Sequence, residues 1–261
     1  MPSENQSCLK SPSRSGPSAD LPSTLTADAF FNGQLTVWQS RTGYRYSLDA
    51  VILAWHARKC SGERVLDMGT GCGIISLIMA HREPSARYWG IDIQPELSEI
   101  AALNVDKNGL GSVISVCCRD LRIVRPEDLG GLFDRVVSNP PFRKSASGRI
   151  NPDEQRAIAR HEISATVDDI AAGARRLLRR GGKLFTLYPA ERIVDVLTAL
   201  RREGVEPKRL RMIQSQQGQG AKLCVVEGVL GGRPAVVVDP PLTIYAEDGR
   251  YTSEMVRIFH P

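Results

Sequence analysis

The sequence has no long uninterrupted apolar run. No stretch approaches the roughly 20 apolar residues that a membrane-spanning helix needs. Its first residues also lack the apolar core that marks a secretory signal peptide. We therefore expect a cytoplasmic protein that makes no contact with a membrane.

Cysteine pairs of the kind that bind metals are missing as well. The chain contains six cysteines and four histidines among 261 residues, and no two cysteines form a C-x-x-C pair. Structural zinc sites are built from such pairs. We therefore expect no metal site.

Neither sign of charge dominates. Lys and Arg number 34, Asp and Glu number 29, and the formal net charge is +5. A mildly basic chain permits a polyanionic partner such as RNA but does not require one.

The chain divides into a polar tail and one long ordered region. Residues 1–26 are rich in Ser and Pro and poor in large apolar side chains, which predicts a disordered tail. No linker interrupts residues 27–261, which we interpret as a single domain. Within its first part, 27–60, we expect a hairpin turning at Thr42-Gly43 and then a helix that begins after Ser47.

From residue 64 onward, strand and helix patterns alternate, which predicts an α/β fold with a parallel sheet and helices on both faces. A later hairpin, at about 208–229, would add an antiparallel edge. The expected strands are 64–68, 87–92, 113–118, 133–138 and 183–188, and the expected helices are 74–82, 95–109, 167–182 and 191–204.

A glycine-rich turn follows the first of these strands. It reads D-x-G-x-G-x-G over residues 67–73. Glycine at a strand-to-helix turn permits positive φ and lets a ligand approach the backbone. The spacing differs from the G-x-G-x-x-G of dinucleotide-binding proteins, which disfavours a nicotinamide dehydrogenase.

The next two strands end in carboxylates. Asp92 lies where a side chain can accept hydrogen bonds from the ribose hydroxyls of a nucleoside, although it can also cap the helix that starts near Pro95. Asp120 can meet the amino group of an adenine, and it is equally well explained as a turn residue. Ligands of such sheets bind outside the carboxyl ends of the strands.

The fourth strand ends in Asn139-Pro140-Pro141-Phe142. The side-chain carbonyl of Asn139 can accept one N–H of a planar amine, and the backbone carbonyl of Pro140 can accept the other. The prolines fix these acceptors in advance, and stacking of a base on Phe142 is worth about 1–3 kcal/mol. The motif therefore suits a planar NH₂ substrate held beside a cofactor, although a rigid loop that merely ends a strand is the alternative.

The ordered set VLDMGTGCG, GIDI, CRDL and SNPPF resembles class I S-adenosylmethionine-dependent methyltransferases, in particular the N-P-P-[FY] branch that acts on amines. Three further segments are similar to the bacterial tRNA(Val) adenine-N(6)-methyltransferase family, and the resemblance covers about residues 28–260. These segments are GYRYSLDAVILA (43–54), NPPFRKSASGRINPDEQRAIARHE (139–162) and PLTIYAEDGRYTSE (241–254).

The resemblance implies a Rossmann-like, mostly parallel seven-stranded sheet and S-adenosylmethionine as cofactor. It also implies that residues 139–142 hold the target base, with Asn139 bordering the cofactor as well. Residues 27–60 would cover the cofactor, although a helix cap and core packing explain Ser47 and its neighbours equally well. The implied cofactor-binding residues are Tyr44, Ser47, Asp49, Asp67, Gly69, Gly71, Gly73, Asp92, Ile93, Asp120, Leu121 and Asn139.

Basic residues follow the N-P-P-F motif. We expect Arg143, Lys144 and Arg149 to contact RNA phosphates. Arg160 and His161 can position RNA, or they can pack within the protein. Transfer from a cationic sulfonium needs no strong base, so proton transfer by His161 stays open.

We therefore predict methyl transfer from S-adenosylmethionine to the exocyclic amino group of an adenine in tRNA, beside the anticodon of tRNA(Val). The expected partner is an anticodon stem-loop, and the expected state is a monomer. Three alternatives remain. They are a ribosomal RNA guanine-N(2) methyltransferase, a protein glutamine methyltransferase, and an RNA-binding protein that needs the cofactor but does not catalyse.

Overall fold

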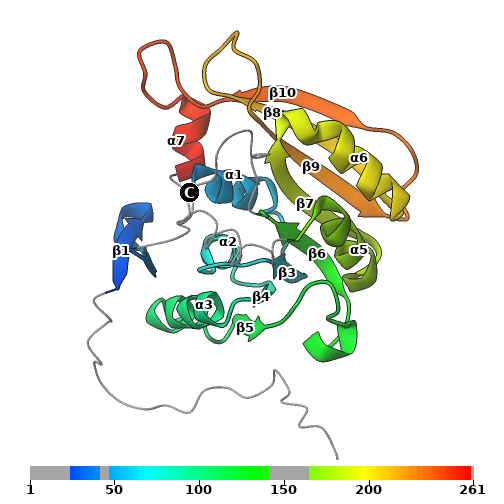
Figure 1. Cartoon of the computed structure of the whole chain (residues 1–261). Coiled ribbons are helices and arrows are strands. Elements are labelled where there is room, and N and C mark those ends of the chain that lie inside the picture. Colours follow the sequence, from blue (N-terminus) through cyan, green and yellow to red (C-terminus); the bar gives the residue numbers. More distant parts are fainter. Residues whose placement is uncertain (1–23, 42–46, 141–164, 260–261) are drawn as a thin grey trace, which may run out of the picture.

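The computed structural model describes residues 24–41, 47–140 and 165–259. Its centre is an eight-stranded sheet with the strand order β10-β8-β9-β7-β6-β3-β4-β5, and a two-stranded sheet, β1-β2, lies apart from it (Figure 1). The strands are β1 (Leu25–Phe30), β2 (Leu35–Ser40), β3 (Arg64–Met68), β4 (Arg87–Asp92), β5 (Ile114–Cys118), β6 (Phe133–Ser138), β7 (Leu178–Pro189), β8 (Val205–Gln214), β9 (Leu223–Leu230) and β10 (Val237–Thr243).

Helices connect most of these strands, as the alternating sequence pattern predicts. The α-helices are α1 (Leu48–His56), α2 (Ile74–Arg82), α3 (Pro95–Lys107), α5 (Val167–Leu177), α6 (Ile193–Arg202) and α7 (Ser253–Phe259). Short 3-10 turns are η1 (Phe31–Gly33), η2 (Pro126–Leu129) and η3 (Ala190–Arg192). None of the helices in this part of the chain is long and apolar enough to cross a membrane.

The predicted parallel sheet is confirmed. β3 pairs in parallel with β4 and β6, β4 with β5, and β6 with β7. Only β9 is antiparallel, to both β7 and β8, so the predicted late hairpin is also confirmed. The sheet has eight strands rather than seven, because β10 adds in parallel to β8 and forms the edge. The antiparallel strand therefore lies inside the sheet and not at its edge.

The amino-terminal hairpin does not turn where we expected. β1 and β2 pair through a turn at η1, with Phe31, Asn32 and Gly33 at φ of 49°, 56° and 84°. The Asn32-Gly33 pair tolerates positive φ and is the sequence signal for this turn. The turn predicted at Thr42-Gly43 lies outside the described residues. Because β1 begins at Leu25, the last two residues assigned to the tail belong to a strand.

The predicted helix 167–182 is too long. α5 ends at Leu177, and β7 begins at the next residue. Gly181 has a φ of +80°, and the pairing of β6 with β7 shifts register between Phe133 and Arg135. Pairing with β6 therefore decides the helix end, and helical periodicity alone cannot predict it.

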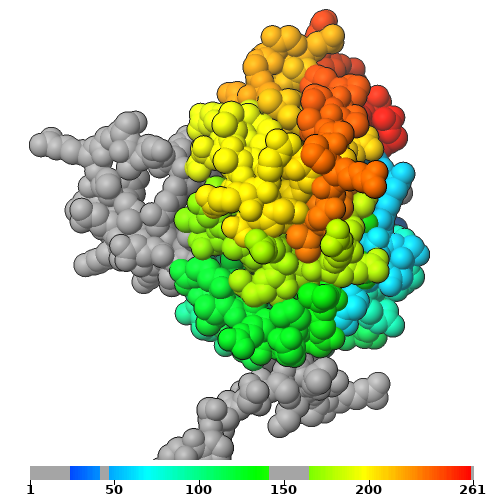
Figure 2. Space-filling model, turned by 90° about the vertical axis from the view of Figure 1, so that its right-hand side faces the viewer, coloured from blue at the N-terminus to red at the C-terminus, as the bar shows by residue number. Residues whose placement is uncertain are grey.

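The helices cover two faces of the sheet. One apolar core involves α1, α2 and α7, and the second involves α5 and α6. Figure 2 shows one side of the molecule, where the yellow and orange C-terminal segments lie above the green middle of the chain. Parallel pairing brings the carboxyl ends of β3, β4, β5 and β6 to one edge, where the predicted site residues follow.

Candidate active site

The glycine turn joins β3 to α2 through three residues with left-handed backbone. Gly69, Gly71 and Gly73 have φ of 74°, 57° and 85°. The turn is held to β4, because the N–H groups of Gly69 and Thr70 both donate to the carbonyl oxygen of Ile91, each at 2.9 Å. The conformation explains why glycine stands at these three positions.

The first two glycines leave space above the turn. A Cβ added at Gly69 or Gly71 would meet nothing within 4 Å among the described residues, whereas one at Gly73 would lie 3.3 Å from the Cβ of Ala101 in α3. Gly73 therefore permits close helix packing. Gly69 and Gly71 leave open space beside their backbone, and contact of a cofactor there stays a prediction.

Asp67 lies beneath this turn and is 1% exposed. Its Oδ2 accepts hydrogen bonds from the hydroxyls of Thr70 at 2.7 Å and Ser76 at 3.1 Å. Its Oδ1 is buried and has no hydrogen-bond partner within the described part of the chain. Burial raises the pKa of this carboxyl from 3.8 to about 6. A buried acceptor without a donor is costly, so a cationic group of a ligand would stabilise it.

Asp92 ends β4 on the other side of the turn. Its Oδ2 accepts from the backbone N–H of Gly71 at 2.9 Å, and its Oδ1 accepts from the N–H of Gln94 at 3.0 Å. Burial raises the pKa of this carboxyl as well. Asp92 thus orders the glycine turn and the residue that precedes α3, but it does not cap the helix. A role in ribose binding stays a prediction, and Ile93 follows directly in the chain.

Asp120 behaves as a turn residue in this structure. Its carboxylate forms a 2.6 Å ion pair with Arg122 and accepts the backbone N–H of the same residue at 2.9 Å. These hydrogen bonds lower the pKa of Asp120. The backbone carbonyl of Leu121 accepts from Arg176 at 2.5 Å. Contact of Asp120 and Leu121 with an adenine stays a prediction.

Asn139 follows β6, and the hydrogen bonds of the preceding residue, Ser138, position it. The Ser138 hydroxyl donates to the carbonyl of Met68 at 2.9 Å, and the Ser138 carbonyl accepts from the Thr186 hydroxyl at 2.9 Å. These two bonds fix the end of β6 between β3 and β7, next to the start of the glycine turn. The Oδ1 atom of Asn139 is buried and has no hydrogen-bond partner among the residues that the structure describes, and Pro140 is buried.

One element of the site was missed from sequence. The side chain of Asn104 in α3 donates to the carbonyls of Cys72 and Trp38, both at 2.8 Å. It therefore ties the glycine turn to the hairpin strand β2. Asn108 stands four residues later and bonds the backbone of Thr36. This spacing, which places both amides on one helix face, was the available signal.

Of the remaining predicted site residues, two lie within the described ranges and eight lie outside them. Ser47 precedes α1 and makes no side-chain cap, and burial raises the pKa of Asp49 in the first turn of this helix. Their contact with a cofactor remains a prediction. The other predicted site residues lie outside the described ranges: Tyr44, Pro141, Phe142, Arg143, Lys144, Arg149, Arg160 and His161.

These groups fit S-adenosylmethionine. Open glycine backbone, the Oδ1 atom of Asp67 and the carboxylate of Asp92 would suit the cationic methionine end and the ribose. The free Oδ1 of Asn139 offers an acceptor on the neighbouring strand. No group of three or more His, Cys, Asp or Glu among the described residues is arranged to hold a metal ion.

Comparison with known proteins agrees with this geometry. Residues 48–201 match the family described as the methyltransferase small domain. A tRNA1(Val) (adenine(37)-N6)-methyltransferase of Porphyromonas gingivalis is 31% identical, covering 91% of this chain and 95% of the relative. The enzyme of the same name from Phocaeicola vulgatus is 32% identical over 86% of this chain and 93% of its own length.

Solved structures share the fold at lower identity. A protein of Agrobacterium tumefaciens described as a predicted O-methyltransferase has a TM-score of 0.65 at 19% identity, covering 81% of this chain and 95% of its own. A 16S rRNA N2 G1207 methyltransferase of T. thermophilus has a TM-score of 0.56 at 16% identity, covering 81% and 52%. By sequence, the chain belongs to the methyltransferase small domain family and, within it, to the tRNA1(Val) (adenine(37)-N6)-methyltransferases.

Proposed function

We propose that this protein transfers a methyl group from S-adenosylmethionine to the exocyclic amino group of an adenine in tRNA, at the position beside the anticodon of tRNA(Val). The proposal includes action as a monomer in the cytoplasm. The observation that carries it is the buried, unpartnered Oδ1 of Asn139 beside the open glycine turn.

The cofactor supplies a methyl group on a positively charged sulfur, which is a strong electrophile. The chain's own residues bind and orient it. Asp67 would accept from the ammonium group through its free Oδ1, and Gly69 and Gly71 would let the methionine end reach the backbone. Asp92 would accept from the ribose hydroxyls, although it must then share its Oδ2 with the Gly71 N–H.

Asn139 would orient the nucleophile. The lone pair of an adenine amino nitrogen is delocalised into the ring, so the nitrogen attacks poorly. Two acceptors, the Asn139 side chain and the Pro140 carbonyl, would hold its two N–H groups and aim the lone pair at the methyl carbon. The proton can leave after transfer, so the step needs no strong base.

The choice of tRNA rests on the relatives. Their names specify adenine 37 of tRNA1(Val). An adenine in a loop is less firmly stacked than one in a duplex, so less free energy is needed to bring it to Asn139. The mild positive charge of the chain is compatible with such a substrate.

The test is methyl transfer from labelled S-adenosylmethionine to unmodified tRNA, ribosomal RNA and release factor, measured side by side. Asn139→Ala serves as the blank, and nucleoside mass spectrometry identifies the product. N6-methyladenine in tRNA(Val) supports the proposal. Label in ribosomal guanine or in a protein glutamine would refute the substrate, and no label in any sample would refute catalysis.

A further inference from the structure

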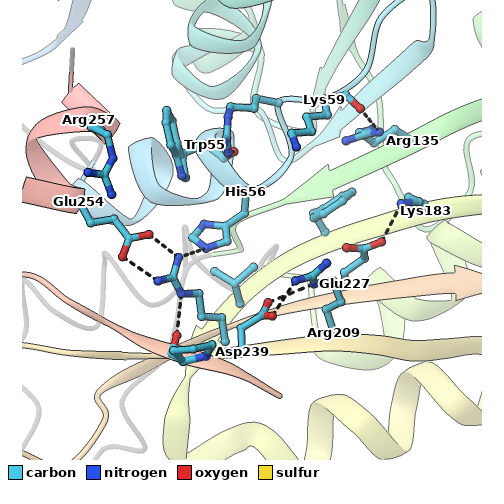
Figure 3. A pocket seen from close by; sticks show the side chains of 15 residues that line it. Trp55, His56, Lys59, Arg135, Lys183, Arg209, Glu227, Asp239, Glu254 and Arg257 are labelled. Carbon is cyan, nitrogen blue, oxygen red and sulfur yellow. Dashed lines mark hydrogen bonds and ion pairs between the residues drawn. The ribbon is translucent and has the colours of Figure 1, made fainter. Parts of the chain in front are cut away.

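A second pocket, remote from Asn139, lies on the sheet face that α1 and α7 flank. Its volume is about 640 Å³, and its lining includes seven Lys or Arg and three Asp or Glu side chains (Figure 3). We call it the basic pocket. Ligand pockets typically measure about 300–1,000 Å³, so there is room for more than one small ion.

Three ion pairs neutralise the walls and floor of the basic pocket. Lys183 pairs with Glu227 at 2.9 Å, Arg209 with Asp239 at 2.6 Å, and Arg211 with Glu254 at 2.8 Å. The deepest cation, Arg135, pairs with Glu63 at 2.8 Å. These pairs use every carboxylate that lines the pocket.

Three lining cations have no ion-pair partner among the described residues: Arg58, Lys59 and Arg257. Lys59 and Arg257 are exposed, and Figure 3 places them on the same side of the pocket, with Trp55 between them. The guanidinium of Arg58 lies 3.5 Å from the centre of the Trp55 ring, which fixes its position. A row of cations along one rim suits a chain of phosphates better than a single ion.

Arg82 strengthens the positive field behind this rim. Its guanidinium lies 4.9 Å from the Trp55 ring, and its Nε and Nη1 atoms are buried without hydrogen-bond partners. Burial lowers the pKa of Arg82 to about 10. A half-buried cation with no carboxylate partner among the described residues raises the local potential and favours an anion nearby.

The basic pocket is too far from the catalytic edge to hold the target nucleotide itself. Arg135 and Asn139 are four residues apart, which is about 13 Å along an extended chain. α1 is about 14 Å long, and only the residues of its last turn, Trp55 and His56, line the pocket. An RNA that reaches both would contact them through different nucleotides.

We propose that the basic pocket binds backbone phosphates of the substrate RNA at nucleotides distant from the target adenine. This inference rests on the proposed function for its ligand. Phosphate contacts position an RNA without reading its sequence. Each contact also releases counterions, so the pocket should add to the salt dependence of binding.

The test is direct binding of labelled unmodified tRNA, measured without S-adenosylmethionine at several salt concentrations. The variant is Lys59→Ala/Arg257→Ala, and the control is Arg87→Ala/Lys107→Ala, which removes two exposed cations elsewhere that have no ion-pair partner in the described ranges. We expect the pocket variant to bind about tenfold more weakly. Its slope of log affinity against log salt should fall by about 1.8 in magnitude if each charge neutralises one phosphate. Equal melting temperatures check folding.

Equal tRNA affinity in the pocket variant and the control would overturn the inference. A titration with inorganic triphosphate separates the two sources of phosphate. Loss of triphosphate binding with unchanged tRNA affinity would assign the pocket to a small molecule and also overturn it. Because binding is measured without turnover, weaker binding of tRNA that the enzyme does not methylate would support the pocket while refuting the proposed function.

Discussion

Asn104 and Trp38 exchange two hydrogen bonds. The Trp38 N–H donates to the Asn104 Oδ1 at 2.7 Å, and the Asn104 Nδ2 donates to the Trp38 carbonyl at 2.8 Å. Asn108 repeats the exchange with Thr36 at 2.9 and 2.7 Å. Four helical residues rise about 6 Å, and two strand residues about 6.7 Å. The side-chain amides of Asn104 in α3 and of Asn108 directly after it therefore pair with β2 much as another strand would.

Asn104→Ala should destabilise the protein by about 3 kcal/mol, because the substitution leaves buried backbone groups of Trp38 and Cys72 without partners. It should also weaken S-adenosylmethionine binding, since Cys72 belongs to the glycine turn. Urea unfolding and calorimetric titration measure the two effects. Asn108→Ala is the matched control, because it releases Thr36 but leaves Cys72 bonded. Equal cofactor affinity in both variants would contradict a role for Asn104 at the turn.

Asn139→Ala should reduce kcat by about 10²–10³, the cost typical of removing one preorganised polar contact to the reacting group. S-adenosylmethionine affinity should stay within about twofold, because the hydrogen bonds of Ser138 that fix the strand end remain. Single-turnover rates measure the effect on methyl transfer, and cofactor titration measures the effect on S-adenosylmethionine affinity. Equal loss of cofactor binding and of rate would show that Asn139 serves the cofactor instead of the base.

Asp67 should give the ligand-free protein a pH-dependent stability. Burial raises its pKa from 3.8 to about 6, so between these values the folded state binds more protons than the unfolded state. The contribution of Asp67 to stability is therefore largest below about pH 4 and falls as pH rises to about 6, by roughly 3 kcal/mol at most. The difference between wild type and Asp67→Asn in urea midpoint, measured from pH 4.5 to 7.5, isolates this carboxyl from Asp92.

Cofactor affinity should show the opposite trend. A cationic ligand group favours the ionised form of Asp67, so S-adenosylmethionine should bind more weakly as pH falls below about 6, by up to tenfold per unit. Asp67→Asn should flatten this dependence and weaken binding at pH 7.5. An identical pH profile in both proteins would exclude Asp67 as the titrating group.

Gly71→Ala should weaken S-adenosylmethionine binding by tenfold or more, because the new methyl group enters the open space above the turn. It should also cost about 1–2 kcal/mol of stability, since φ is +57°. Gly62→Ala is a matched control, because its φ is +68° and its added Cβ also meets nothing within 4 Å. Both variants should lose similar stability, measured by urea unfolding, but only Gly71→Ala should lose affinity. Equal affinities would place the cofactor elsewhere.

Local patterns predicted most of the sheet. Strands 64–68, 87–92 and 133–138 and helix 74–82 match the structure at both ends. Continuous apolar runs and glycine punctuation mark such buried parallel strands clearly. The D-x-G-x-G-x-G spacing likewise predicted a tight turn, and the observed positive φ values agree.

The sequence by itself determined the strand order along the chain, the glycine turn and which strand ends carry polar residues, because short-range spacing sets these features. Tertiary structure alone decided the end of α5, the eighth strand, the pairing of Asn104 with Trp38 and the assembly of the basic pocket. Each of these depends on contacts between residues far apart in sequence. Asn104 and Trp38, for example, are 66 positions apart, and periodicity within one segment carries no information about such a partner.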